Sequence, residues 1–566
     1  MSVWFDGERL CVQLNRNLDY KVVLRIAEES EYSEYLQEVG IYCLPPTRKN
    51  ARLLYDAGYR FDETAQPFLR TSEKSREEKV SEPTDDLYPF QREGVNILLS
   101  NRNNYLLADE MGLGKTVQVL TYLKLNPEAL PAIVICPASL KLNWAKEVEK
   151  WVGVKSYVLS GRTPEYLSDE FLESYPIWII NYDILGTEDK EEREHENDRI
   201  QYCKENGLNF RRKKIKVHGW CDEICRHQFN TIICDEVQYI AEPDTLRSRG
   251  VRQICESNAR KIFLSGTPYE TRTSQFFTCL NILNKYLFPN RWKFLMDYCN
   301  AKKTPFGWQF NGLSNADDLH EKISTLMIRR LKKDVLTQLP PKTRIIVPME
   351  VSKANRRIYD KAEIELDEAI RKHEKNALTK LAELKQASFE AKKDAVIQWI
   401  KDYLDVNDKL VVFVYHRAVF ELLMETFGKI AVGINGETPN AKRQAYVEKF
   451  QTNKKTRLFI GQIKATNTGL TLTASNATCF VEFGSTAPQH SQAEDRVHRI
   501  SQEADAVFAY YLILDNSIDN TIMDILNSRN ADLQKVLNNE DNSQLFETNF
   551  NKAILSKYKE NKSQNI

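Results

Sequence analysis

The chain has 566 residues, of which 79 are basic and 79 acidic, and a hydrophobic fraction of 42%. This length exceeds what one hydrophobic core supports, so two or three domains are expected, and the balanced charge excludes binding of nucleic acid through overall positive charge, leaving only a locally basic groove. No apolar run reaches 18 residues, which excludes a membrane helix, and eleven cysteines without a framework spacing indicate reduced thiols in a cytosolic or nuclear compartment.

The first 80 residues predict a small α+β module. Short alternating apolar runs occur at residues 10–14 and 20–24, and a helical pattern covers residues 28–40. The polar stretch at residues 72–86 is typical of a mobile linker. The module is either a packing appendage or a sensor of DNA structure, and its residues do not decide between the two.

The stretch YLLADEMGLGKT at residues 105–116 predicts a phosphate-binding loop. An apolar run indicates a strand, two glycines permit a tight turn, and Lys115 with Thr116 opens a helix whose free amides point at a triphosphate. Lys115 would neutralise the β and γ phosphates, and the Thr116 hydroxyl would ligate Mg²⁺. Asp109 stands where the general GxxxxGK[ST] pattern has its first glycine. The residues predicted to bind ATP here are Asp109, Glu110, Met111, Gly112, Leu113, Gly114, Lys115 and Thr116.

Apolar strands then alternate with helical patterns, which predicts a parallel sheet covered by helices. The predicted strands are residues 132–136, 177–180, 231–234 and 261–264. Polar or small residues follow these strands, and ligands in open α/β sheets bind beyond the carboxyl ends of strands. The sequence therefore predicts that every candidate chemical motif lies on one rim of this sheet.

The carboxylate pair Asp235 and Glu236 follows the apolar run TIIC. Such a pair often only caps the next helix. Combined with the upstream GLGKT, it predicts phosphoryl-transfer chemistry, in which Asp235 holds Mg²⁺ and Glu236 orients or deprotonates the attacking water.

A charged insertion separates two of the strands at residues 186–230 and contains RRKKIK at residues 211–216. It either touches DNA phosphates or is a solvated excursion, and the second interpretation is the commoner one. The insertion also contains four residues near zinc-ligand spacing, but they lack a CxxC pair, which disfavours a metal site. These four residues are His218, Cys221, Cys225 and His227.

Residues 351–403 predict long helices, and a second alternating region begins near residue 409. Its predicted strands, which give a second parallel sheet, are residues 409–416, 430–434, 457–461, 477–483 and 507–514. This half has no phosphate loop. Instead, Arg496 and Arg499 are spaced to lie on one helical face, where both could reach an anion across a cleft. Surface arginines are usually solvated, but the triphosphate site of the first half lacks an arginine, which favours the functional interpretation.

The ordered motifs FQREG, DEMGLGKT, CPASL, DEVQ, LSGTP, GLTLTASN and QAEDRVHRISQ resemble those of the Swi/Snf-type ATPases of helicase superfamily two, over residues 85–535. Residues 297–342 are similar to the HARP-type annealing helicase branch. The resemblance implies an α/β protein with two RecA-like parallel-sheet lobes that close on ATP and grip double-stranded or branched DNA. The expected parts are the N-terminal module (1–80), lobe 1 (85–300), a helical protrusion and linker region (301–405), lobe 2 (406–535) and a tail (536–566).

The resemblance also implies roles for single residues. Gln91 would contact adenine and Gln492 would contribute to the ATP site, while Arg496 and Arg499 would act as arginine fingers. Residues implied to couple nucleotide state to DNA are Ser265, Gly266, Thr267 and Gly469. Residues implied to contact DNA phosphates, with little sequence preference, are Ser139, Asn181, His416, Arg417 and Thr468. Gln238 stands where the family usually has His, so we expect coupling altered in degree, with Gln238 still able to hydrogen-bond toward the γ-phosphate or Gln492.

The sequence therefore predicts a monomeric, ATP- and Mg²⁺-dependent DNA translocase that remodels forks, anneals strands or migrates branches. It would be cytoplasmic in a bacterial or phage setting and nuclear in a eukaryote. Two alternatives remain: a nucleotide-gated DNA-binding scaffold with weak turnover, motivated by Gln238, and a translocase that displaces proteins from duplex DNA. The complete set of lysine, acidic pair and arginines favours an enzyme over a scaffold.

Overall fold

The structure is a computed structural model that divides into two compact units. The first unit comprises residues 1–269, 273–298 and 315–330, and the second comprises residues 270–272, 299–314 and 331–566. The residues that the structure describes are 2–6, 9–13, 33–36, 39–62, 64–68, 86–100, 103–208, 215–305, 307–310, 312–336, 338–372, 374, 376–466, 470–499 and 501–538. Among these residues, no helix combines the length and the apolar composition that a membrane crossing requires.

In the residues that the structure describes, the N-terminal module consists of a five-stranded sheet and one α-helix. Its elements are β1 (Ser2–Phe5), β2 (Leu10–Gln13), β3 (Glu34–Leu36), β4 (Ile41–Leu44), α2 (Arg48–Asp56) and β5 (Arg60–Phe61), and the strand order is β3-β4-β2-β1-β5. Val3, Val12 and Leu54 are among the residues of its buried core. The helix predicted at residues 28–40 is wrong where the structure describes it, because β3 pairs with β4 there and the Tyr35 ring packs on that of Tyr42. The run at 20–24 and residues 72–85 of the predicted linker lie outside the described residues.

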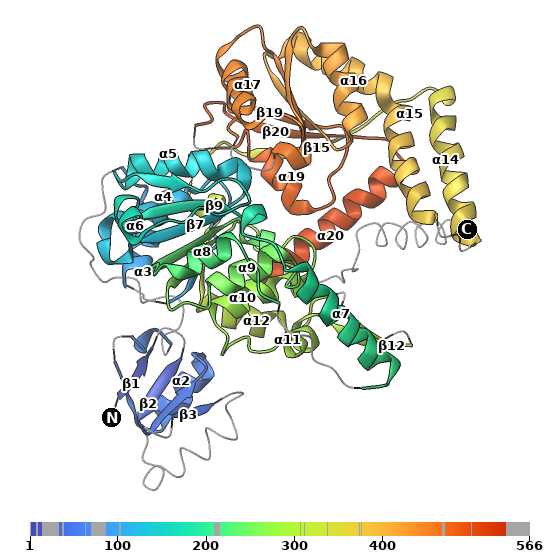
Figure 1. Cartoon of the computed structure of the whole chain (residues 1–566). Helices are drawn as coiled ribbons and strands as arrows, with labels where there is room; N and C mark the ends of the chain where they lie inside the picture. The colour runs from blue at the N-terminus through green and yellow to red at the C-terminus, as the bar shows by residue number, and fades with distance from the viewer. Residues whose placement is uncertain are drawn as a thin grey trace. The chain divides into compact units, whose positions relative to one another are not determined.

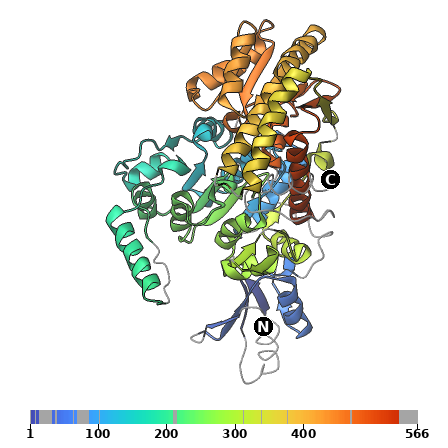
Figure 2. The same ribbon diagram turned by 90° about the vertical axis from the view of Figure 1, so that its right-hand side faces the viewer.

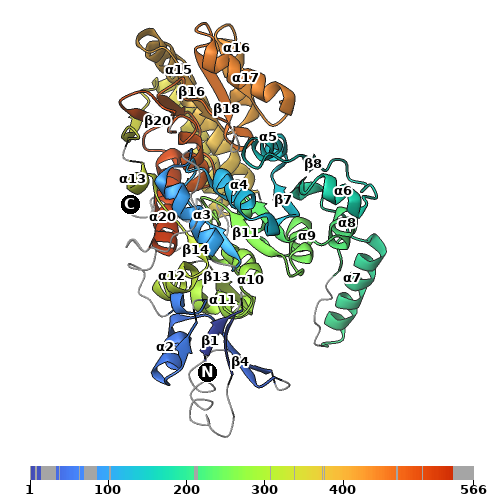
Figure 3. The same ribbon diagram turned by 90° about the vertical axis from the view of Figure 1, so that its left-hand side faces the viewer.

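The first unit contains a seven-stranded, wholly parallel sheet (Figure 3). In spatial order its strands are β14 (Met327–Ile328), β6 (Tyr105–Leu107), β11 (Arg260–Leu264), β10 (Thr231–Asp235), β7 (Ala132–Cys136), β9 (Ile177–Asn181) and β8 (Ser156–Val158). The central strands are continuous apolar runs because helices cover both faces of such a sheet. The predicted strands of this half are confirmed, whereas β8 and β14 were not predicted.

Helices of the first unit position the strands from either side. They are α3 (Pro89–Ser100), α4 (Lys115–Leu125), α5 (Lys141–Trp151), α6 (Asp169–Ser174), α7 (Lys190–Glu205), α8 (Trp220–Arg226), α9 (Leu246–Ile254), α10 (Phe277–Leu283), α11 (Arg291–Tyr298) and α12 (Ala316–Ser324). Leu98 of α3, Leu120 of α4 and Trp144 of α5 share one buried cluster with the sheet. One face of the sheet is therefore covered by α3, α4 and α5, and α4 begins at the end of the predicted phosphate-binding loop.

The charged insertion forms α7 and α8, the former visible as the long helix labelled in Figure 1. The two histidines of the zinc candidate each contact a carboxylate: His218 lies 3.1 Å from Asp222, and His227 lies 2.8 Å from Asp169. Among the described residues, no group of three or more His, Cys, Asp or Glu is arranged to hold a metal ion. Residues 211–214 of the basic run lie outside the described residues.

The second unit is built on a six-stranded parallel sheet (Figure 1). In spatial order its strands are β15 (Lys342–Pro348), β20 (Val507–Ile513), β19 (Ala477–Phe480), β16 (Leu410–Val414), β18 (Leu458–Gln462) and β17 (Ala431–Ile434). The five predicted strands are confirmed, and β15 was not predicted because each of its side chains is partly or fully exposed. This unit also includes an antiparallel pair, β12 (Ala301–Thr304) and β13 (Gly307–Phe310).

The helices of the second unit are α13 (Lys332–Val335), α14 (Lys353–Arg371), α15 (Ala377–Val406), α16 (Arg417–Phe427), α17 (Asn440–Thr452), α18 (Ile463–Thr466), α19 (Ala487–Glu494) and α20 (Ile518–Asn538). The long helices α14 and α15, yellow and gold, run side by side in Figures 1 and 2. Ile400 of α15 and Leu423 of α16 pack on one face of the sheet, and Phe450 of α17 and Ile518 of α20 belong to the cluster on the other.

The structure divides residues 301–405 differently from the expected parts. Residues 315–330 belong to the first unit because β14 is the edge strand of its sheet. Strand β15 and the helices α14 and α15 belong to the second unit, since β15 pairs along its whole length with β20. The chain therefore makes its last passage from the first unit to the second between Arg330 and Leu331, after earlier passages at residues 269/270 and 298/299.

Candidate nucleotide-binding site

The phosphate-binding loop connects β6 to α4, and its end is held by Gln91 of α3. Helix α4 begins at Lys115, preceded by Gly114 in the left-handed conformation with φ of 77°. A side chain at Gly114 would overlap the amide of Gln91, which donates a 3.1 Å hydrogen bond to the carbonyl of Leu113. The Gln91 side chain therefore lies beside the turn that precedes α4. For this reason, only glycine fits at position 114.

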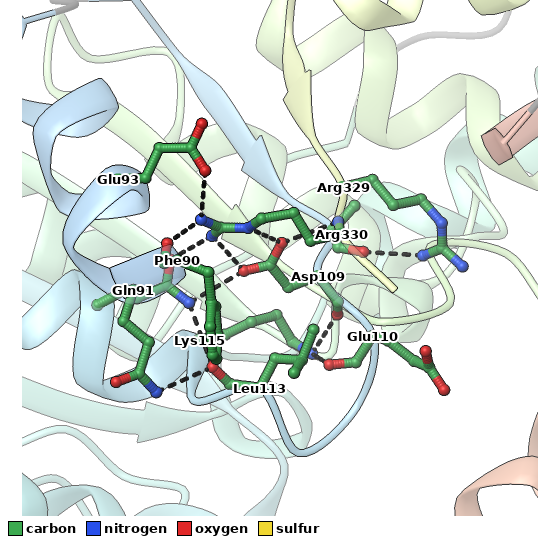
Figure 4. Close-up of polar contacts among 11 residues, drawn as sticks. Phe90, Gln91, Glu93, Asp109, Glu110, Leu113, Lys115, Arg329 and Arg330 are labelled. Carbon is green, nitrogen blue, oxygen red and sulfur yellow. Dashed lines mark hydrogen bonds and ion pairs between the residues drawn. The ribbon is translucent and has the colours of Figure 1, made fainter. Parts of the chain in front are cut away.

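The Lys115 ammonium occupies the interior of the loop (Figure 4). Its Nζ donates a 2.7 Å hydrogen bond to the carbonyl of Asp109, and the carbonyl of Glu110 lies 3.5 Å away. Desolvation lowers the pKa of Lys115, while Glu236 and the other nearby carboxylates oppose that shift. A phosphate group entering the loop would supply the negative charge that favours the ammonium form.

The Asp109 side chain points into the protein and is held by Arg330 (Figure 4). Arg330 Nε and its backbone amide donate to one carboxylate oxygen at 3.0 and 3.1 Å, and Nη2 donates to the other at 2.5 Å. Gln118 of α4 bridges the pair, donating to Asp109 at 3.0 Å and accepting from Arg330 at 2.7 Å. The loop has Asp109 in place of the usual glycine. The carboxylate of Asp109 holds the loop in position through its buried contacts with Arg330 and Gln118.

Asp235 ends β10 and is fixed by two aromatic side chains. The indole Nε1 of Trp144 donates a 2.8 Å hydrogen bond to its carboxylate, and the Tyr182 hydroxyl donates a 2.7 Å bond to its carbonyl. Burial, reinforced by the neighbouring Glu236, raises the pKa of Asp235 to about 7, whereas the Trp144 hydrogen bond and Lys115 favour its charged form. A cation at this carboxylate would offset the burial cost, which suits the predicted Mg²⁺ role.

Glu236, Gln238, Ser265 and Thr267 form a hydrogen-bonded chain. Gln238 donates at 2.8 Å to the Glu236 carboxylate, and its oxygen accepts at 2.7 Å from the Ser265 hydroxyl. The Ser265 hydroxyl oxygen in turn accepts from the Thr267 amide at 3.0 Å. Glu236 has φ of 54° and ψ of 58°, a left-handed conformation that is uncommon for glutamate and is found at functional sites. The acidic pair is thereby connected to the segment that follows β11.

That segment also approaches the phosphate-binding loop directly. A Cβ atom at Gly266 would lie 3.1 Å from the backbone nitrogen of Met111 and 3.5 Å from Lys115 Nζ. Arg329 Nη1 donates to the carbonyls of both Ala108 and Gly266, at 2.8 and 2.9 Å. The segment after β11 and the phosphate-binding loop are therefore joined through one guanidinium group.

In the second unit, Gln492 lies on α19, but the expectation that Arg496 and Arg499 share a helical face is wrong. Helix α19 ends at Glu494, and both arginines lie in the turns that follow it. Beyond the helix, the Arg496 carbonyl accepts a 2.8 Å hydrogen bond from the Leu472 amide. Arg496 is buried, and Arg499 Nη1 donates to the Thr471 hydroxyl at 3.0 Å.

Two buried carboxylates hold this turn in place. Arg344 contacts Glu494 through two hydrogen bonds of 2.7 and 2.9 Å, and Lys342 lies 2.9 Å from the same carboxylate. Lys332 and Lys342 both contact Asp495, at 2.8 and 3.2 Å. Glu494 and Asp495, which precede the arginines, therefore bind cationic side chains from residues 332–344.

The predicted DNA-contacting residues lie in different surroundings. Ser139 is exposed after β7, and Asn181 is buried at the end of β9. His416 Nδ1 lies 2.6 Å from Glu482, and Arg417 is exposed and paired with Glu421 at 2.7 Å. Thr468 and the coupling residue Gly469 lie outside the described residues.

Sequence reasoning missed Trp144, Gln118, Arg329 and Arg330. Trp144 belongs to a helix that a sequence pattern assigns to the core, and the two arginines belong to the basic run RRLKK, which is typical of a solvated face. One signal was available: Asp109 in a tight apolar loop requires a buried cationic partner. Its partner is 221 residues away in the sequence, so the pattern could not identify it.

Comparisons with known proteins agree with these motifs. SWI/SNF-related matrix-associated actin-dependent regulator of chromatin subfamily A-like protein 1 of Xenopus tropicalis is 30% identical over 461 residues, which are 78% of this chain and 44% of that protein. The DNA annealing helicase and endonuclease ZRANB3 of Bos taurus is 31% identical over 456 residues, 78% of this chain and 40% of that protein. The chain thus spans less than half the length of these curated relatives.

A solved Sulfolobus solfataricus SWI2/SNF2 ATPase core in complex with dsDNA is 22% identical and covers 81% of this chain and 95% of that one, with a TM-score of 0.34. The helicase conserved C-terminal domain matches residues 391–501. The SNF2-related domain matches residues 90–400, which is more than half of the chain, and the protein therefore belongs to the SNF2-related family.

Proposed function

We propose that the protein is an ATP-hydrolysing DNA translocase that acts on double-stranded or branched DNA. The observation that carries this proposal is the arrangement on one rim of the first sheet. Lys115 Nζ lies in the loop after β6, 3.5 Å from where a Cβ of Gly266 would be, and Glu236 is hydrogen-bonded through Gln238 to the neighbouring Ser265. Each group has a distinct task in phosphoryl transfer. A protein that only bound DNA would need none of them.

The protein groups would act in the following way. Lys115 binds the β and γ phosphates inside the loop, and Gln91, which is hydrogen-bonded to the end of that loop, contacts the adenine. Glu236, oriented by its 2.8 Å hydrogen bond from Gln238, positions the attacking water and accepts its proton. Because Gln238 also binds Ser265, a change at the γ-phosphate alters the segment after β11.

Thr116 and Asp235 would hold Mg²⁺, which neutralises developing charge on the phosphates. The residues fit this ion because the Asp235 carboxylate is buried and is held in one orientation by the hydrogen bond from Trp144. Arg496 and Arg499 would supply the positive charge that stabilises the transferred phosphoryl group. Their turn is held by buried ion pairs, which suits groups that must keep a fixed orientation.

DNA as the partner is supported by family membership and by the relatives, of which one is named a DNA annealing helicase and endonuclease. Ser139, Asn181, His416 and Arg417 remain the candidate phosphate contacts on this chain, together with Thr468. Such contacts confer little sequence preference, so the shape of the DNA would decide where the enzyme acts.

The proposal is tested by measuring ATP hydrolysis with no DNA, linear duplex, single strands, forks and Holliday junctions. We expect stimulation by duplex-containing DNA and fork regression coupled to hydrolysis. Lys115→Ala and Glu236→Gln should each lower kcat by about a hundredfold or more, whereas Lys124→Ala, at the exposed end of the same helix, should not. Wild-type protein without DNA-stimulated hydrolysis would refute the proposal.

A further inference from the structure

The last of the chain's three crossings from the first unit to the second lies within the sequence Arg329-Arg330-Leu331-Lys332. Arg330 is the last residue of the first unit, and Leu331 begins the second. The segment follows β14, which pairs in parallel with β6. It therefore leaves the first sheet at the carboxyl ends of the strands, as the phosphate-binding loop does. The pairing continues beyond the strands, because the Glu110 amide donates a 2.9 Å hydrogen bond to the Arg330 carbonyl.

On one side of the crossing, Arg330 is bound to the phosphate-binding loop. Its guanidinium contacts both oxygens of Asp109, and it also contacts the carbonyl of Phe90 and, at 3.3 Å, Glu93. Asp109 is 0% exposed and Arg330 8% exposed. Asp109 uses its carboxylate for Arg330 and its carbonyl for Lys115, so a displacement of Arg330 reaches the phosphate-binding lysine through one residue. We call this set the loop contact.

On the other side, Lys332 is bound to the turn that carries the arginines. Its Nζ lies 2.8 Å from the Asp495 carboxylate and donates to the carbonyl of His498 at 3.2 Å. Lys332 is 4% exposed and Asp495 3%. Asp495 uses its carboxylate for Lys332 and its carbonyl for Arg499, whose Nε donates to it at 3.2 Å. We call this set the arginine contact.

Only Leu331 separates the two contacts along the chain. Two extended residues span at most about 7 Å between Cα atoms, so covalent geometry alone limits how far Arg330 and Lys332 can separate in any state of the enzyme. A longer connection at this point would release Arg330 and Lys332 from that limit while each kept its own contact.

We infer that Arg330 and Lys332 are positioning residues. Together they form a short mechanical link between the phosphate-binding loop and the turn that carries Arg496 and Arg499. The inference rests on the proposed function. A change in the loop when ATP binds is passed through Asp109 and Arg330, across Leu331, to Lys332 and Asp495, and so sets the orientation of Arg499. Buried ion pairs suit this role, because they are directional and a lost partner leaves a buried charge unpaired.

The test lengthens the link without removing either contact. Insertion of Gly-Ser-Gly after Leu331 keeps the loop contact and the arginine contact but adds about 10 Å of possible separation. We expect a fluorescent ATP analogue to bind within about twofold of wild type, since the loop is intact, while DNA-stimulated kcat falls about tenfold to a hundredfold with little change in KM. A merely structural role would not divide kcat from KM in this way.

The matched control inserts the same three residues after Gln338, an exposed turn residue beyond Lys332, which preserves the Arg330-to-Lys332 spacing. This variant should retain DNA-stimulated hydrolysis within about twofold. A second pair guards against misfolding: Lys332→Met should lower kcat and leave analogue binding unchanged, and Lys332→Arg should restore most of the rate.

Three outcomes would overturn the inference alone: normal hydrolysis by the Leu331 insertion, an equal loss in the Gln338 insertion, or normal hydrolysis by Lys332→Met. Wild-type protein without DNA-stimulated hydrolysis would instead overturn the proposed function, and this inference with it.

Discussion

The indole Nε1 of Trp144 donates a 2.8 Å hydrogen bond to the carboxylate of Asp235. Burial and the adjacent Glu236 raise the pKa of Asp235 to about 7, and the Trp144 donor limits that rise because it stabilises the charged form. If Asp235 must be ionised to hold Mg²⁺, kcat/KM for ATP should fall as the pH drops below about 7, since this parameter reports the free enzyme.

Trp144→Phe removes the donor and keeps the aromatic volume. The charged form of Asp235 loses a partner, so its pKa should rise further, and the acid limb of the kcat/KM profile should move up by about one pH unit. Trp151→Phe is the matched control, because Trp151 donates a similar 2.9 Å bond to Glu147 on α5 and not to the acidic pair. An acid limb that stays in place in Trp144→Phe would contradict the assignment.

The hydrogen-bonded chain through Gln238 gives a second prediction. Gln238→Leu leaves Glu236 without its donor and Ser265 without its acceptor, so kcat should fall by about tenfold or more while KM for ATP changes little. Gln238→His keeps a side chain that can hydrogen-bond at this position, and it should lose less. The measurement is steady-state hydrolysis with forked DNA. Equal rates for the leucine variant and wild type would show that the chain does not orient Glu236.

The parallel strands could be predicted because they are buried on both faces. The runs AIVIC in β7 and LVVFV in β16 are wholly apolar, and each is followed by a polar or turn-forming residue. Strand β14 has two residues, and β15, with the sequence KTRIIVP, is largely exposed, so neither carries that signal. Both are edge strands, and both lie in the region where the expected domain boundaries differ from the observed units.

The site divides in the same way. Lys115 and the pair Asp235 and Glu236 occur within short contiguous motifs, so their local order indicates their chemistry. The residues that hold them do not: Arg330 is 221 residues from Asp109, and Lys332 is more than 160 residues from Asp495. Such partners are specified by the adjacency of strands and by tertiary packing, which one sequence pattern cannot supply.

The buried pair of Asp109 and Arg330 predicts an asymmetry in stability. Asp109→Ala leaves the buried guanidinium of Arg330 with only the partly exposed carboxylate of Glu93, at 3.3 Å, and should lower the local stability by about 3–5 kcal/mol. The double variant Asp109→Leu with Arg330→Met replaces both charges by apolar groups and should be more stable than the single variant. Amide hydrogen exchange of β6 and β14 in the full chain measures this local stability.

The control for this comparison is Glu368→Ala, which removes an exposed i,i+4 pair with Lys372 on α14 and should change local stability by less than about 0.5 kcal/mol. If the amides of β6 and β14 exchanged faster in the double variant than in Asp109→Ala, the prediction would be wrong. The two charged groups would then stabilise the fold by more than the neutralisation of each other's charge.

The turn that carries the arginines predicts acid sensitivity of the second unit. Burial opposes ionisation of Glu494, yet Lys342 and Arg344 lower its pKa from 4.5 to about 2. Burial lowers the pKa of His490 to about 4. Both folded-state values lie below the unfolded ones, so both groups stabilise the fold above the unfolded pKa and lose that contribution as the pH falls through the folded one. For His490 the window is pH 6.5 to 4, and for Glu494 it is 4.5 to 2.

Glu494→Gln should therefore destabilise the second unit at pH 7, by about 3–5 kcal/mol for a broken buried pair, but progressively less below pH 4.5. Hydrogen exchange of β15 and β20 amides, corrected for the intrinsic pH dependence of exchange, should show the variant and wild-type curves converging in acid. Glu437→Gln, which removes an exposed partner of Arg417, should give the same pH dependence of hydrogen exchange as the wild type. Variant and wild-type curves that stay parallel down to low pH would mean that Glu494 is not held in its charged form by Lys342 and Arg344.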